Sequence, residues 1–128
     1  MQEFLANIKP KQRGVFSQLR SAIVALPEVQ ESIEIDELSG DWCPAYRVRG
    51  SDLVWVHLTD RLWVHIPIEP SLEKKVLQDE NLDSELIEKV SESEEDDGVK
   101  LAKLEVKSID SIDQVMSLLK LKHAALVA

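Results

Sequence analysis

The chain has 128 residues and a formal net charge of −9, with 44% hydrophobic and 30% charged residues. Its length fits one domain, residues 1–128, and its composition is typical of a soluble globular protein that buries roughly two thirds of its unfolded surface. The single cysteine excludes an intrachain disulfide framework, and no apolar run reaches the roughly 20 residues that a membrane-spanning helix needs.

The negative charge is concentrated in residues 79–97. This stretch holds ten acidic residues and one base, Lys89, so it accounts for the whole net charge of −9. Because such a segment repels a phosphate backbone, no nucleic-acid partner is expected. It is interpreted as a solvated helix face and loop, and weak binding of a hard metal ion by its carboxylates is the alternative.

The residues after Met1 are polar and acidic, without the basic segment and apolar core of a secretory signal. A free cysteine, Cys43, suits a reducing compartment. Together these features predict a cytoplasmic protein that has no membrane partner.

Helices and strands are expected in turn along the first half of the chain. Residues 2–8 predict a short helical turn, and a longer helix begins at Pro10 and ends before Pro27, with apolar residues three or four apart. Alternating residues predict strands at 31–36 and 44–48. Residues 38–43 are interpreted as a loop and residues 50–52 as a tight connection.

Residues 54–68 carry the clearest pattern, two alternating runs that predict a β-hairpin. Cross-strand partners must point to the same face, and a three-residue loop at residues 59–61 satisfies this condition. It pairs Leu58 with Leu62, Val56 with Val64, His57 with Trp63, and Trp55 with His65. A two-residue loop would mix the faces, so the sequence predicts a sheet with one aliphatic face and one aromatic and imidazole face.

Helical spacing returns after Pro70. Two short helices are expected, capped by Ser71 and Asn81, followed by a polar loop at residues 91–98 and a strand at 99–106. Ser111 and Gln114 match a capping box at the start of the last helix. The apolar stripe of that helix consists of Ile112, Val115, Met116, Leu119 and His123.

This order of elements predicts an α+β fold. Short links between strands favour antiparallel neighbours, so a single antiparallel sheet of about five strands is expected. The sheet packs against the N-terminal and C-terminal helices, and a helical insertion precedes the last strand.

The segments PAYRVRGSDLVWVHL, RLWVHIP and VKLAKLEVKSIDSIDQVMSLLKLKHA resemble the YdhG-like families of small bacterial domains. The resemblance implies a helix, a strand opened by Pro44 and Tyr46, a hairpin ending in proline, and a closing helix begun by Asp110 or Asp113. Some of these proteins are regarded as frataxin-like iron handlers, which implies an iron or divalent-metal site as an alternative function. Frataxins carry their acids on the first helix, which is basic here, so no metal ligand is carried over.

The aromatic and imidazole face is the predicted ligand-binding surface. Its candidate residues are Trp42, Tyr46, Arg47, Trp55, His57, Trp63 and His65. If helices cover only the aliphatic face, these side chains form a patch for a small molecule or a partner protein. If the helices of residues 70–90 cover it instead, the tryptophans form the second half of the core.

Three function classes follow from these residues. The preferred one is a non-enzymatic binding module without a cofactor, which uses the Trp and His face. The second is a frataxin-like metal-binding protein, although His57 and His65 lack neighbouring ligands at zinc spacing. The third is a small hydrolase or transferase, which requires a lowered pKa at Cys43. No phosphate loop or G-x-S-x-G elbow is present, and the sequence indicates neither the ligand nor the oligomeric state.

Overall fold

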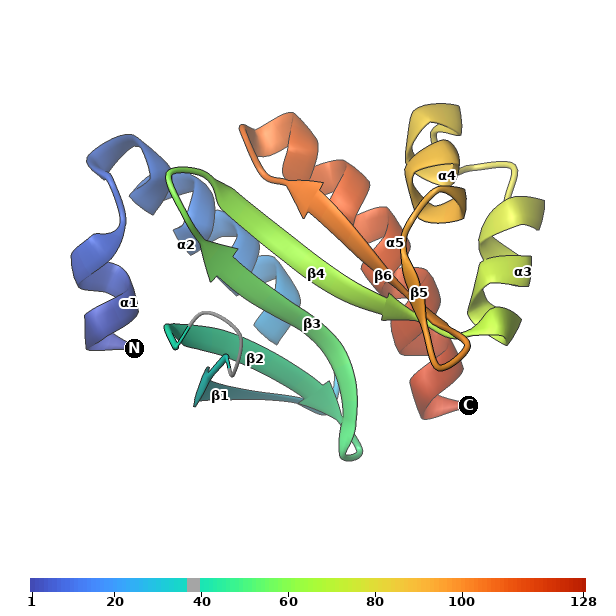
Figure 1. Cartoon of the computed structure of the whole chain (residues 1–128), viewed down its shortest axis with the longest axis horizontal. Helices are drawn as coiled ribbons and strands as arrows, with labels where there is room; N and C mark the ends of the chain where they lie inside the picture. The colour runs from blue at the N-terminus through green and yellow to red at the C-terminus, as the bar shows by residue number, and fades with distance from the viewer. Residues whose placement is uncertain (37–39) are drawn as a thin grey trace.

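A six-stranded antiparallel sheet forms the centre of the molecule, in the order β1-β2-β3-β4-β6-β5 (Figure 1). The computed structural model describes residues 1–36 and 40–128. The strands are β1 (Val29–Ile35), β2 (Trp42–Val48), β3 (Ser51–Leu58), β4 (Leu62–Ile68), β5 (Glu95–Asp96) and β6 (Val99–Glu105). The helices are α1 (Gln2–Asn7), α2 (Pro10–Val24), α3 (Pro70–Gln78), α4 (Ser84–Ser91) and α5 (Ile109–Val127). The predicted α+β class, with one antiparallel sheet and a helical insertion, is confirmed.

The hairpin of β3 and β4 has the register that the face argument predicts. Trp55 pairs with His65 and His57 pairs with Trp63, while the aliphatic partners alternate with them on the other face. The backbone N–H of Thr59 donates to the carbonyl of Arg61 at 2.9 Å and closes the three-residue loop at residues 59–61. The register is therefore set by the separation of aliphatic from aromatic side chains.

The buried aliphatic residues of the core face one side of the sheet, where the helices pack. Figure 1 shows α2 and α5 behind the sheet, and no described helix crosses the face turned toward the viewer. Phe16, Leu19 and Ile23 of α2 are buried at helical spacing, and they join one apolar cluster with α5 and the strands. The predicted stripe of α5 is buried as well. The cluster also takes Leu72, Val76, Leu86 and Val90 from α3 and α4, which places these helices on the aliphatic side.

Three predicted helix starts are wrong by a few residues. Helix α3 begins at Pro70, whose fixed φ suits the first helical position, rather than after a Ser71 cap. The cap of α4 is Asp83, whose carboxylate accepts the N–H of Glu85 at 2.8 Å, and not Asn81. Helix α5 begins at Ile109, so Ser111 lies inside its first turn instead of opening a capping box.

Three predicted connections are shorter than expected. Residues 91–98 were expected to be a loop, yet they contain β5, which turns into β6 through Asp97 and Gly98 at φ values of 52° and 82°. Both residues favour this left-handed conformation, which a tight hairpin requires. Residues 51 and 52 belong to β3, and the preceding turn is made by Arg49 and Gly50. Of the predicted loop 38–43, residues 42 and 43 belong to β2, and 38 and 39 lie outside the described residues.

Candidate functional site

The second face of the sheet is left open by the described helices. Trp55 and His57 of β3 project onto it beside Trp63 and His65 of β4, since these residues pair across the hairpin. All four side chains are half-buried, and none belongs to the apolar cluster under the helices. Of the two arrangements left open by the sequence, the tryptophans of the hairpin do not form a second core under α3 and α4.

Three rings form a stacked row on this face. The imidazoles of His57 and His65 lie with their centroids 3.8 Å apart and their planes inclined by 19°. The indole of Trp55 continues the row, with its centroid 6.5 Å from that of His57 and an angle of 26°. The row therefore offers a π surface to anything that lies on the face.

The two imidazoles are neutral at physiological pH. The pKa of His65 is lowered to about 4, first by burial and then by the positive charges that His57 and Lys103 can carry nearby. Burial also lowers the pKa of His57, against the opposing effect of Asp36. A neutral imidazole has one N–H donor and one acceptor nitrogen, so the row combines ring faces with hydrogen-bonding edges.

Arg47 closes one end of the row. Its guanidinium carbon lies 5.5 Å from the ring centroid of Trp55, within the range of a cation–π contact. Its Nε donates to Asp52 at 2.9 Å, and its Nη2 donates to Glu34 at 3.0 Å. Because two carboxylates already neutralise this cation, Arg47 holds Trp55 in place and has little charge left for a ligand.

A hollow of about 270 Å³ lies beside the stacked row. Its apolar and aromatic lining consists of Trp55, His57, His65, Pro67 and Leu101, and its charged rim of Asp36, Asp52 and Lys103. Lys103 is exposed and makes no ion pair with any residue that the structure describes. The hollow therefore has a flat aromatic wall and one cation available at its rim.

The face includes five of the seven predicted site residues and excludes two. Tyr46 is fully buried on the helix side, where its hydroxyl donates to Glu31 at 2.8 Å. Trp42 is 43% exposed, but it pairs with Ile35 and lines a different cavity together with Phe4. Side chains alternate between the two faces along β2, so Trp42 and Tyr46 point to the face opposite that of Arg47.

Pro67, Leu101 and Lys103 were missed as lining residues. They lie on the open face because Pro67 pairs with Leu101 and His65 pairs with Lys103. The alternation of residues 99–106 contains this information, since Ala102 and Leu104 are the buried members of β6. The alternation in residues 99–106 is less regular than in the hairpin, so the sequence does not decide which residues of β6 face the helices.

Cys43 lies next to the histidine row and is not activated. Its Sγ is 3.6 Å from Nδ1 of His57, and the thiol donates to the carbonyl of Asp41 at 3.8 Å. Burial, followed by the charges of Asp36 and Asp41, raises the pKa of Cys43 to about 11. A hydrolase or transferase based on this cysteine would need the opposite shift, so the geometry does not support that function class.

A metal centre is not supported either. Among the side chains that the structure describes, no group of three or more His, Cys, Asp or Glu residues is placed to hold a metal ion. Asp36 Oδ2 lies 3.6 Å from His57 Nδ1, which is longer than a close hydrogen-bonding arrangement requires.

No protein-family model, curated protein or solved structure matches this chain. The YdhG-like resemblance therefore stays a prediction. Among the described helices, none has the length and apolar character that crossing a membrane requires.

Proposed function

We propose that the chain is a non-enzymatic binding module that takes a small, flat ligand on the open face of its sheet. The observation that carries this proposal is the stacked row of Trp55, His57 and His65, which borders a hollow and is not covered by any helix that the structure describes. Exposed ring faces on a rigid sheet bury ligand area at low conformational cost, because the strands already hold them.

The chemistry of the hollow favours an aromatic ligand with an anionic group. A planar ring can lie against the neutral imidazoles and the indole, and each aromatic pair contributes about 0.5–1.5 kcal/mol beyond area burial. The ammonium of Lys103 at the rim is available to pair with a carboxylate. Lys103 is on β6, and the carboxylate of Asp36 is also on the rim, so the ligand is oriented with its anionic group toward β6.

A suitable probe is naphthalene-2-carboxylate, whose fused rings match the flat wall. At about 0.3 kcal/mol per non-hydrogen atom, its dissociation constant is expected to be on the order of 1 mM. Ligand-observed NMR titration measures affinities in this range. We expect saturable binding that weakens at least about fivefold in His65→Ala, through lost stacking, and in Lys103→Met, through the lost ion pair.

Tyr46→Phe is the matched control, because Tyr46 lies on the other face of the same sheet. This variant should bind the probe as the unmodified chain does. The proposed site would be contradicted if His65→Ala bound the probe as strongly as the unmodified chain does. It would also be contradicted if Tyr46→Phe bound the probe as weakly as His65→Ala is expected to. If no small ligand binds and a specific protein partner binds the same face, the face is a protein-binding surface and not a ligand site.

A further inference from the structure

The outer edge of the sheet is only half paired at β6. The short strand β5 pairs with β6 at two positions, Glu95 with Lys100 and Asp96 with Val99. One further bond runs from the N–H of Leu101 to the carbonyl of Glu94 at 3.0 Å. Beyond Leu101, no strand of the described residues lies against this edge.

The direction of the unpaired backbone groups follows from one hydrogen bond. The N–H of Val106 donates to the carbonyl of Leu62 at 2.8 Å, so alternate residues of β6 point their peptide groups toward β4. The residues between them, Lys103 and Glu105, point their N–H and C=O groups away from β4. None of these four groups bonds to another described backbone group, so they form a template for a further strand.

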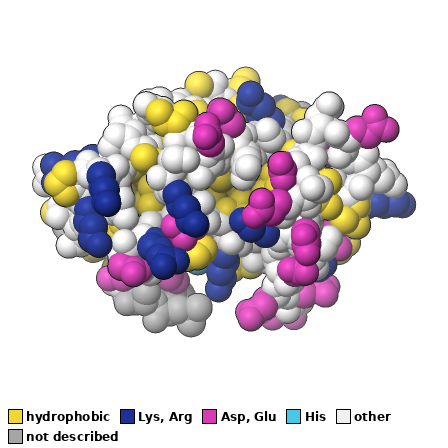
Figure 2. Space-filling view, turned by 90° about the horizontal axis from the view of Figure 1, so that it is seen from above, with side chains coloured by type: hydrophobic (Ala, Val, Ile, Leu, Met, Phe, Trp, Pro, Cys, Tyr) yellow, Lys and Arg dark blue, Asp and Glu magenta, His cyan; other side chains and the backbone are white. Residues whose placement is uncertain are grey.

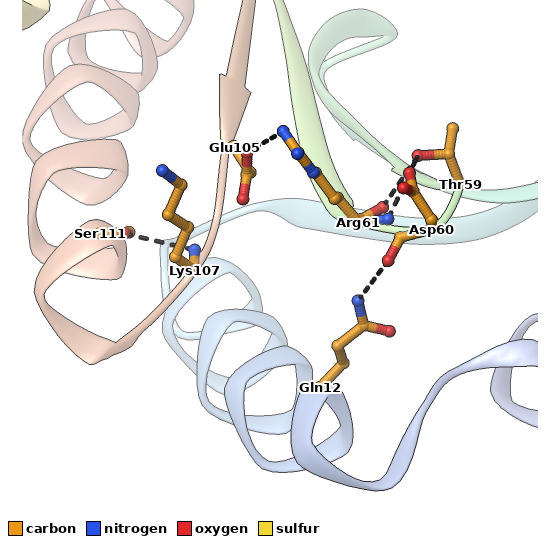
Figure 3. A network of polar contacts seen from close by, with 7 residues as sticks. All are labelled: Gln12, Thr59, Asp60, Arg61, Glu105, Lys107 and Ser111. Carbon is orange, nitrogen blue, oxygen red and sulfur yellow. Dashed lines mark hydrogen bonds and ion pairs between the residues drawn. The ribbon is translucent and has the colours of Figure 1, made fainter.

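This free edge lies in a groove of about 550 Å³. The groove is bounded by Trp63 and β6 on one side and by the end of α4 on the other, with Glu92 and Glu94 near its β5 end and Lys107 at its α5 end. Figure 3 shows that Glu105 turns its carboxylate toward Arg61, with which it forms an ion pair at 3.3 Å. In the view of Figure 2, acidic side chains gather over the α4 half of the molecule and basic ones over the α1 and α2 half.

We propose that this groove binds an extended segment of a partner protein, which adds to β6 as an antiparallel strand. Backbone hydrogen bonds to Lys103 and Glu105 supply the affinity, and alternate side chains of the segment lie against Trp63 and Leu101. An antiparallel segment begins near Lys107 and ends near Glu94. Charge complementarity therefore requires an acidic residue near its start and a basic residue near its end.

A second copy of this chain does not fit the groove. Its own β6 carries α4 alongside, because α4 and β6 are in contact in each molecule. If the β6 strands of two copies paired, their α4 helices would occupy the same space. A single extended segment carries no such helix. The groove shares Leu101 and Lys103 with the hollow of the proposed function, but the two sites use different groups: the groove uses the outward backbone groups of β6, and the hollow uses the imidazole row.

The experiment begins with random seven-residue peptides displayed on phage and selected against the whole chain. We expect the selected peptides to alternate apolar and polar residues, with an acid toward the N-terminus and a base toward the C-terminus. Binding of a selected peptide should slow hydrogen exchange at the amides of Lys103 and Glu105 by about tenfold or more. The amides of Ala102 and Leu104, which already bond to β4, should change much less.

The deciding variants are Lys103→Pro and Lys103→Ala. Proline removes the outward N–H together with the lysine side chain, a change that edge strands tolerate, and it should weaken peptide binding by about fivefold or more. Alanine removes the side chain but keeps the N–H, so peptide binding should stay within about twofold. Urea unfolding checks that both variants fold. If Lys103→Pro does not fold, the hydrogen-exchange measurement on the unmodified chain tests whether the peptide binds at β6. No selected peptide, equal binding to both variants, or protection away from β6 would overturn the proposal.

Discussion

His57 and His65 stack face to face on the two strands of one hairpin, with ring centroids 3.8 Å apart. They are diagonal neighbours, since each is directly paired with a tryptophan across the strands. A charge on either imidazole would face the other ring and the cation of Lys103, as well as the cost of burial. The contact is therefore favourable only while both rings are neutral, and this condition makes the face sensitive to acid.

The first prediction concerns stability at low pH. The pKa of His65 is about 4 in the fold and about 6.5 in the unfolded chain, so the unfolded state binds more protons between these values. Stability is then lost as the pH falls through this window. By about pH 4.5 the loss due to His65 reaches about 2 kcal/mol, and His65→Phe should remove that part of the pH dependence. Urea unfolding at about pH 7 and about pH 4.5 measures this loss of stability. An NMR titration that gives His65 in the folded chain a pKa near 6.5 would show that His65 does not cause the loss.

The second prediction concerns the thiol of Cys43. Its buried position and its pKa of about 11 leave far less thiolate in the folded chain than in the unfolded one, where the pKa is about 9. An aromatic disulfide reagent at about pH 8 should therefore react at least about 100-fold more slowly with the native chain than in guanidinium chloride. A native rate equal to or above the denatured rate would restore the cysteine as a candidate nucleophile.

The third prediction concerns Lys122, which is fully buried in α5 and donates its ammonium hydrogen to the carbonyl of Pro67. Burial lowers its pKa to about 8, so the unfolded chain binds more protons between pH 8 and 10.5 and stability rises across that window. Lys122→Met should raise the free energy of unfolding at neutral pH by about 1–3 kcal/mol and remove the rise. Denaturant unfolding at several pH values measures both effects.

Lys120→Met is the control for this change, because Lys120 is an exposed residue of the same helix. Its substitution should alter stability by less than about 0.5 kcal/mol at any pH. A Lys122→Met variant that is less stable than the unmodified chain at neutral pH would show that the bond to Pro67 outweighs the cost of the buried charge.

The fourth prediction concerns Tyr46 and Glu31. Burial raises the pKa of Glu31, but hydrogen bonds from Arg20 and Tyr46 outweigh it and hold that pKa below its ordinary value. Tyr46→Phe removes one of these bonds, so we expect the pKa of Glu31 to rise and stability to fall by about 1 kcal/mol. Carboxyl titration by NMR and denaturant unfolding check the two effects, and an unchanged pKa of Glu31 would show that Arg20 alone holds the carboxylate.

The register of the central hairpin could be predicted from parity alone. Leu58 and Leu62 must face the same side, and an odd loop is the solution that keeps Trp55 and His57 off the aliphatic face. The buried stripe of α5 was equally clear from its spacing. Such patterns are strong because a slip of one residue would expose a whole apolar set.

Other features depend on contacts that local sequence does not contain. The position of Cys43 beside His57 results from the pairing of β2 with β3, which contains an irregularity between Tyr46 and Arg47. The open state of the Trp and His face depends on where α3 and α4 pack, and their apolar stripes fit either side of a sheet. The strand β5 was overlooked because its two residues are acidic and exposed.

The central claim is that the open face binds a flat aromatic ligand, and the three indole N–H signals of the chain test it most directly. Trp55 and Trp63 lie on that face, whereas Trp42 lines a separate cavity. Naphthalene-2-carboxylate, added to about five times its expected dissociation constant of about 1 mM, should shift the signal of Trp55, which lines the hollow, and leave that of Trp42 in place. A Trp55 signal that stays fixed, or a shift confined to Trp42, would contradict the account.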